Sequence, residues 1–146
     1  MRLTTTTRHA QQQLSLSALF WVGPLTILAC LSANAIVRTI AVTFFGVSAS
    51  FQPLQLPTII GSTVVYLLLA ITAFLLVSRM SERPVRSYRI LASVCLLLSL
   101  LFPLMALAGV FPTPGMNGQI FWSMIAMHIF SAAIVITLLP TAIIRR

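Results

Sequence analysis

Four long apolar stretches, separated by short polar or proline-containing connections, dominate the pattern of this chain. They cover residues 18–45, 57–78, 87–110 and 119–142. Each reaches the roughly 20 residues that an α-helix needs to cross a hydrocarbon core of about 30 Å. Membrane-spanning β-strands would instead alternate apolar and polar residues over about ten positions. The pattern therefore predicts an all-α, polytopic membrane protein in which four transmembrane helices form a bundle.

The rest of the chain is too short for a second domain. We expect a polar tail at residues 1–17, a single transmembrane domain at residues 18–142 and a basic end at residues 143–146. Residues 1–35 also resemble a secretory signal, because two arginines precede an apolar stretch and small residues follow it. Since the apolar character continues to Phe45, we expect an uncleaved first helix.

The composition agrees with burial in lipid. The 146 residues are 59% hydrophobic and 7% charged, with a mean hydropathy of +1.05. Soluble domains contain about 25% charged residues, so this inventory cannot build a water-exposed surface.

All nine basic residues are arginines, and eight of them lie outside the predicted spans, at alternate connections and at the chain ends. Arg2 and Arg8 precede the first span, whereas the connections at residues 46–56 and 110–118 carry no charge. By the positive-inside rule, both termini and the charged loop are expected to be cytoplasmic. Anionic lipid headgroups are the expected partners of the arginines outside the spans, chiefly Arg79, Arg83, Arg86, Arg89, Arg145 and Arg146. Nucleic acid is not expected, because aromatic residues do not interleave with these arginines.

One charge lies inside a predicted span. Arg38 precedes Phe44 by six residues, or about 9 Å of helix, and Asn34 shares its face one turn away. An ionisable residue within the membrane is a candidate functional group. The alternative is a structural arginine whose side chain snorkels to the outer headgroups.

Polar groups on the other three spans fall at a similar depth. The proline of the third span cannot donate a backbone hydrogen bond, which frees the carbonyl four residues before it. If these groups face inward, they form one polar layer with Asn34 and Arg38, made of Ser62, Thr63, Tyr66, the Ser99 carbonyl and His128. Such a layer suits a small anion or polar solute, but polar residues that join helices explain the same set.

The residue types that the spans lack exclude several kinds of site. Glu82 is the only carboxylate and lies in the charged loop, which excludes a proton relay built on intramembrane acids. Cys30 and Cys95 stand alone on their spans, so we predict no zinc or thiol redox centre. We expect no cofactor, no metal and no catalytic residue.

The outer segment at residues 46–56 is uncharged, and Pro53 prevents a regular helix through its middle. We expect it to lie along the outer interface or to dip over the bundle.

The chain resembles a family of small four-helix bacterial membrane proteins of unknown function. The likeness rests on WVGPL at 21–25, ANAIVRTIAV at 33–42, FQPLQLP at 51–57, RPVRSYRILA at 83–92 and MHIFSAA at 127–133. The resemblance implies the four-helix topology and that Arg38 and His128 belong together. It also implies an acid beside the proline of the third span, but here Pro103 is followed by Leu104.

The sequence thus predicts a non-catalytic membrane protein. We expect a subunit or helix-packing partner of another membrane protein, or a homo-oligomer. Small residues such as Ala29, Ala33 and Ser131–Ala133 would permit close helix contact. The alternative is a binder or carrier of a small anionic or polar solute around Arg38 and His128.

Overall fold

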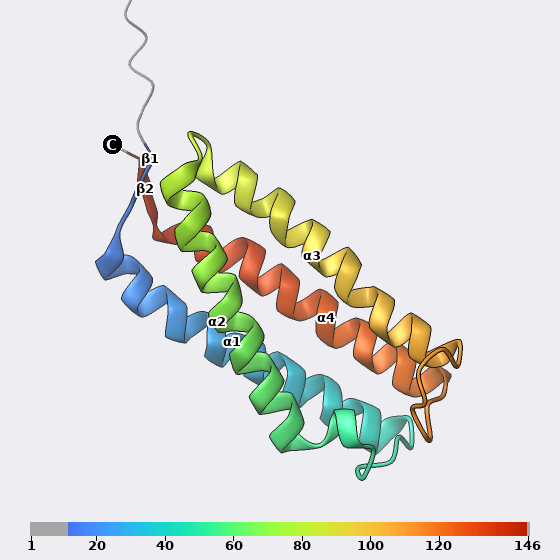
Figure 1. Ribbon diagram of the computed structural model, residues 1–146. Helices are drawn as coiled ribbons and strands as arrows, with labels where there is room; N and C mark the ends of the chain where they lie inside the picture. Colours follow the sequence, from blue (N-terminus) through green and yellow to red (C-terminus); the bar gives the residue numbers. More distant parts are fainter. Residues whose placement is uncertain (1–11, 146) are drawn as a thin grey trace, which may run out of the picture.

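The computed structural model describes residues 12–145, and in this range four long helices form a bundle (Figure 1). They are α1 (Leu16–Phe44), α2 (Leu56–Met80), α3 (Pro84–Leu107) and α4 (Gly118–Leu138). Contacts join α1 to α2, α2 to α3, α3 to α4 and α1 to α4, so the four helices close into a ring in chain order. All four helices of the described range are long and apolar enough to cross a membrane. The described chain is therefore an all-α bundle of four candidate membrane-spanning helices, by helix length and composition.

The helix ends follow from local chemistry. Ser15 caps α1, because its hydroxyl oxygen accepts a hydrogen bond from the Ala18 N–H at 3.2 Å. Asn117 caps α4 in the same way through the Ile120 N–H, at 2.9 Å. At the other end of α1, Gly46 has a φ of 64°, a conformation that glycine adopts without strain.

The third and fourth helices differ most from the predicted spans. The third helix occupies Pro84–Leu107 rather than residues 87–110, because Pro84 suits the first turn and the left-handed Gly109 lies just beyond the end. The fourth α-helix stops at Leu138 and continues as a short 3₁₀ turn, η2 (Leu139–Ala142), because Pro140 cannot extend an α-helix.

A small two-stranded sheet joins the two tails, which the sequence did not predict. Strand β1 (Gln12–Leu14) pairs antiparallel with β2 (Ile143–Arg145), and Gln13 lies opposite Ile144. Figure 1 shows this sheet at the same end of the bundle as the connection between α2 and α3. The beginning and end of the described chain are thus held at the end of the bundle that carries the charged loop.

The core divides into two apolar clusters along the bundle axis. The first includes Cys30, Leu67, Phe74, Tyr88 and Val135. The second lies nearer the uncharged connections and includes Ala41, Leu54, Ile59, Ile120 and Met127.

The outer segment contributes to the second cluster. Val47, Phe51 and Leu54 are buried against it, and residues Gln52–Leu54 form a 3₁₀ turn, η1. Of the two expected placements, along the outer interface or over the bundle, this packing agrees with the second. Pro53 lies within the short η1, and no regular helix runs through the segment.

Candidate functional site

Three polar side chains from three helices, two of them buried and Ser131 half-buried, form one hydrogen-bonded layer. The Asn34 amide nitrogen on α1 donates to the Thr63 hydroxyl on α2 at 3.0 Å. The Ser131 hydroxyl on α4 donates to the Asn34 amide oxygen at 3.2 Å. Asn34 and Thr63 are 6% and 8% exposed, so this bonding replaces water for groups that would be costly to bury alone. Asn34 is thus the central residue of a layer that joins α1, α2 and α4.

The layer separates the two apolar clusters on all three helices. On α1 Asn34 lies between Cys30 and Ala41, and on α2 Thr63 lies between Ile59 and Leu67. On α4, Ser131 lies between a methionine of the second cluster and a valine of the first. The same order recurs on each of the three helices. The hydrogen bonds of the layer can therefore form only when the helices are aligned at one height along the bundle axis.

Cys30 strengthens the contact between α1 and α4 beside this layer. Its thiol is fully buried and donates a weak hydrogen bond to the Ser131 carbonyl, with 3.7 Å between sulfur and oxygen. A side chain of α1 therefore reaches the backbone of α4, which requires small residues at the contact. Some of the small residues predicted for contact with a partner are thus used inside the bundle.

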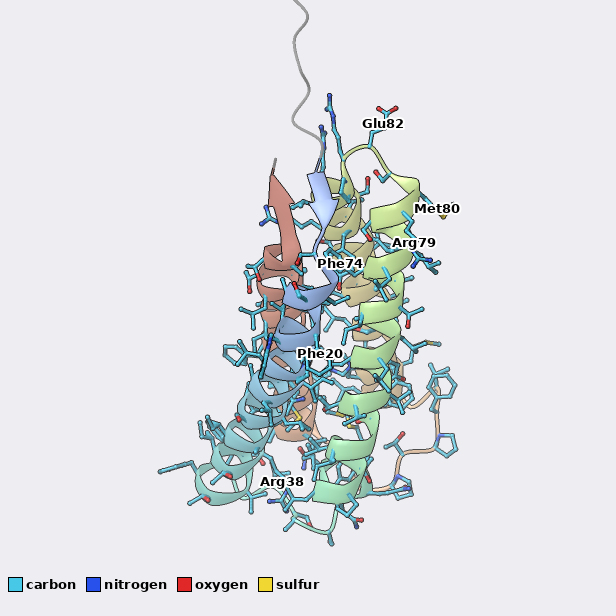
Figure 2. The ribbon with its side chains drawn as sticks, turned by 90° about the vertical axis from the view of Figure 1, so that its left-hand side faces the viewer. Phe20, Arg38, Phe74, Arg79, Met80 and Glu82 are labelled. Carbon is cyan, nitrogen blue, oxygen red and sulfur yellow. The ribbon has the colours of Figure 1, made fainter. Side chains whose placement is uncertain are left out.

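Arg38 lies one turn beyond Asn34 and is oriented by the outer segment. Its Nε donates to the Leu54 carbonyl at 2.7 Å, and the side chain is half-buried. Figure 2 shows Arg38 near the end of the bundle opposite Glu82. The chain's single acid therefore does not neutralise it.

His128 makes a separate, local bond. Its Nδ1 lies 2.7 Å from the Met124 carbonyl on the same helix, and since a carbonyl only accepts, Nδ1 carries the proton. Among residues 12–145, no hydrogen bond joins His128 to Arg38, although the resemblance implied that they belong together.

Besides Arg38 and His128, three further predicted members do not join the hydrogen bonds of the layer. Tyr66 is 70% exposed, so the prediction that it faces inward is wrong. The inner face of α2 repeats every four residues through Ile59, Thr63 and Leu67, which turns Tyr66 outward. The Ser62 hydroxyl bonds the Ile59 carbonyl of its own helix at 3.2 Å. At Ser99, whose backbone carbonyl is the predicted member, the hydroxyl bonds the Leu96 carbonyl of the same helix at 2.7 Å.

The predicted lipid anchors gather at the opposite end. Arg79, Arg83, Arg86 and Arg89 are exposed, and Figure 2 shows Arg79 and Glu82 at this end. The backbone of Arg145 belongs to β2 at the same end, whereas Arg146 lies outside the described residues.

Comparison with known proteins identifies a family. The sequence profile of a family of unknown function, DUF6069, matches residues 15–144. The chain belongs to this family. No curated protein and no solved structure matches the chain significantly.

The match to DUF6069 includes every residue of the polar layer, together with Arg38, His128 and the charged loop. Because the function of the family is unknown, any role has to be argued from these side chains. In the part of the chain that the structure describes, no three His, Cys, Asp or Glu side chains gather as a metal site.

Sequence reasoning missed one member of the layer. Ser131 was expected only as a small residue at a helix contact, but its hydroxyl and its carbonyl are both bonded to α1. The available signal was its spacing from Met127 and Val135, which share its buried face of α4.

Proposed function

We propose that this member of DUF6069 is a non-catalytic protein of the bacterial inner membrane, with both termini and the charged loop cytoplasmic. It acts as a small subunit or helix-packing partner of a membrane assembly. The orientation is supported by the gathering of exposed arginines and both described chain ends at one end of the bundle.

The non-catalytic role is supported by the hydrogen-bond partners of the polar groups within the spans. Asn34, Thr63 and Ser131 bond one another, whereas Arg38 and His128 bond backbone carbonyls. A catalytic site needs a nucleophile or base aimed at an open space beside charge-stabilising donors. Here the same groups hold helices and the outer segment in place.

A partner is supported by the outer surface of α3. This helix is the least buried of the four spans. In its apolar 18-residue stretch 11% is buried inside the protein, against 22–28% in the other three. Large apolar side chains project from it, among them Ile90, Leu97, Leu98 and Phe102. The face is free to pack against another membrane helix, from a different protein or from a second copy.

The test is co-purification of the tagged full-length chain from its native membrane in mild detergent. We expect a partner or a second copy in stoichiometric amount, lost when Leu97 and Leu98 are both replaced by Trp. The matched control replaces Val65 and Leu69, exposed residues of α2, by Trp and should leave the complex intact. A strictly monomeric wild-type protein without a partner would argue against this role.

A further inference from the structure

Arg38 carries a positive charge that no carboxylate of the chain neutralises. The only acid, Glu82, follows the far end of α2, and α2 has 25 residues. At the α-helical rise this separates Glu82 from the beginning of α2 by roughly 37 Å. That distance is several times the Debye length of about 8 Å at physiological salt. A half-buried guanidinium beside apolar surfaces therefore needs a counter-ion from outside the chain.

The hydrogen bond to Leu54 fixes how the guanidinium is presented. Leu54 is fully buried, and its own N–H bonds the Phe51 carbonyl at 2.9 Å, so its carbonyl is a rigid acceptor. The bond occupies Nε of Arg38 and leaves the two terminal Nη amino groups. Among the described residues, the Tyr88 hydroxyl is the buried side-chain polar atom that lacks a hydrogen-bond partner. The Nη atoms of Arg38 are not buried in this way, so they are open to the surface.

We propose that Arg38 binds a phosphate group end-on through its two Nη amino groups at the outer end of the bundle. The same chemistry is offered by the phosphodiester of a bilayer phospholipid and by free inorganic phosphate. An arginine fork matches two phosphate oxygens with two parallel hydrogen bonds, whereas Nε, already bonded to Leu54, supplies the anchor. The proposal rests on the membrane placement of the bundle argued above.

The surroundings agree with an anion at this position. The first turn of α2, which begins two residues after Leu54, holds no acid. The connection from Gly46 to Gln55 carries no charge either, so nothing there repels phosphate. Arg38 also lies only about 9 Å of helix from the end of α1, within reach of the headgroup region for a long side chain.

The test uses the full-length protein in lipid nanodiscs that contain a phospholipid with a photoreactive headgroup. Cross-links are quantified by mass spectrometry at residues 46–57 and at the charged loop. In Arg38→Gln we expect the cross-link at residues 46–57 to fall about tenfold or more, as loss of charge-assisted hydrogen bonds implies. The cross-link at the charged loop is the internal control and should not change. An unchanged signal at residues 46–57 overturns the proposal.

A second variant keeps the test decisive if Arg38→Gln does not fold. A lysine ammonium lacks the planar fork, so in a folded Arg38→Lys protein we expect the cross-link to fall by roughly threefold. A wild-type signal in Arg38→Lys overturns the bidentate geometry. Thermal unfolding in detergent shows which variants remain folded.

Added inorganic phosphate separates the two sources. If the cross-link at residues 46–57 in the wild type persists, the ligand is the lipid phosphodiester. If it declines as phosphate is added, the site takes the free anion. Both leaflets contain phospholipid, so these results do not depend on the orientation or partner of the bundle. Failure of this proposal is therefore distinguishable from failure of the proposed function.

Discussion

Replacing Asn34 by leucine tests whether the polar layer holds the three helices together. The substitution keeps the branched shape of the side chain, at a larger volume, but removes both interhelical hydrogen bonds, to Thr63 and from Ser131. Interhelical hydrogen bonds in membrane proteins contribute about 0.6 kcal/mol each on average, so we expect a loss of about 1–2 kcal/mol. The loss is limited because the freed hydroxyls can bond carbonyls of their own helices.

A double-mutant cycle isolates the bond between the helices. Asn34→Leu is combined with Thr63→Val, and stability is measured by reversible unfolding in detergent, followed by circular dichroism. We expect a coupling free energy of about 0.6–1 kcal/mol between the two sites.

The matched control is Thr72, which lies on α2 like Thr63. The Thr72 hydroxyl bonds the Leu68 carbonyl of its own helix at 2.8 Å, so Thr72→Val should couple to Asn34→Leu by less than about 0.3 kcal/mol. Equal coupling for Thr63 and Thr72 would refute the reasoning, because the layer would then contribute no more than an ordinary hydroxyl.

Two further substitutions probe the rest of the fold by the same unfolding assay. Tyr88→Phe removes a buried hydroxyl without a partner and keeps the edge-to-face contact with Phe74, at 4.9 Å between ring centroids. Stability should rise by about 0.5–1 kcal/mol, and a clear fall would reveal a bonding partner for this hydroxyl. Gly46→Ala should lower stability by about 1 kcal/mol, because φ is 64° there although a Cβ would meet no atom within 4 Å. The control Gly61→Ala, in the second turn of α2 with equally open space, should be neutral or stabilising. Equal losses at both glycines would contradict the backbone argument.

The sequence predicted the four helices well because their length and apolar character are set by the hydrocarbon core. It placed Asn34 and Thr63 in one polar layer by residue counting along each span, and the hydrogen bond between them agrees with that placement. It did not predict which face of each helix is inward. A membrane helix is apolar on its lipid face as well as its core face, so little amphipathic signal remains to orient it.

Tyr66 and Ser131 show this limit in opposite directions. Tyr66 is amphipathic and was placed inside, but it lies off the buried stripe of α2 and is exposed. Ser131 was read as a small packing residue, although its hydroxyl completes the layer. The strands β1 and β2 were missed because three-residue strands leave no periodic pattern, and their pairing depends on the bundle bringing the two tails together.

The central claim is that four helices cross the membrane with the arginine-rich loop inside. Single cysteines at Ala49 and Glu82, both exposed in their connections, test it by labelling intact cells with a membrane-impermeant maleimide. The wild-type chain is the control, because Cys30 and Cys95 lie within the candidate spans. We predict that Ala49→Cys is labelled from outside and that Glu82→Cys reacts only after the membrane is permeabilised. Labelling of Glu82→Cys in intact cells, with Ala49→Cys protected, would contradict the account.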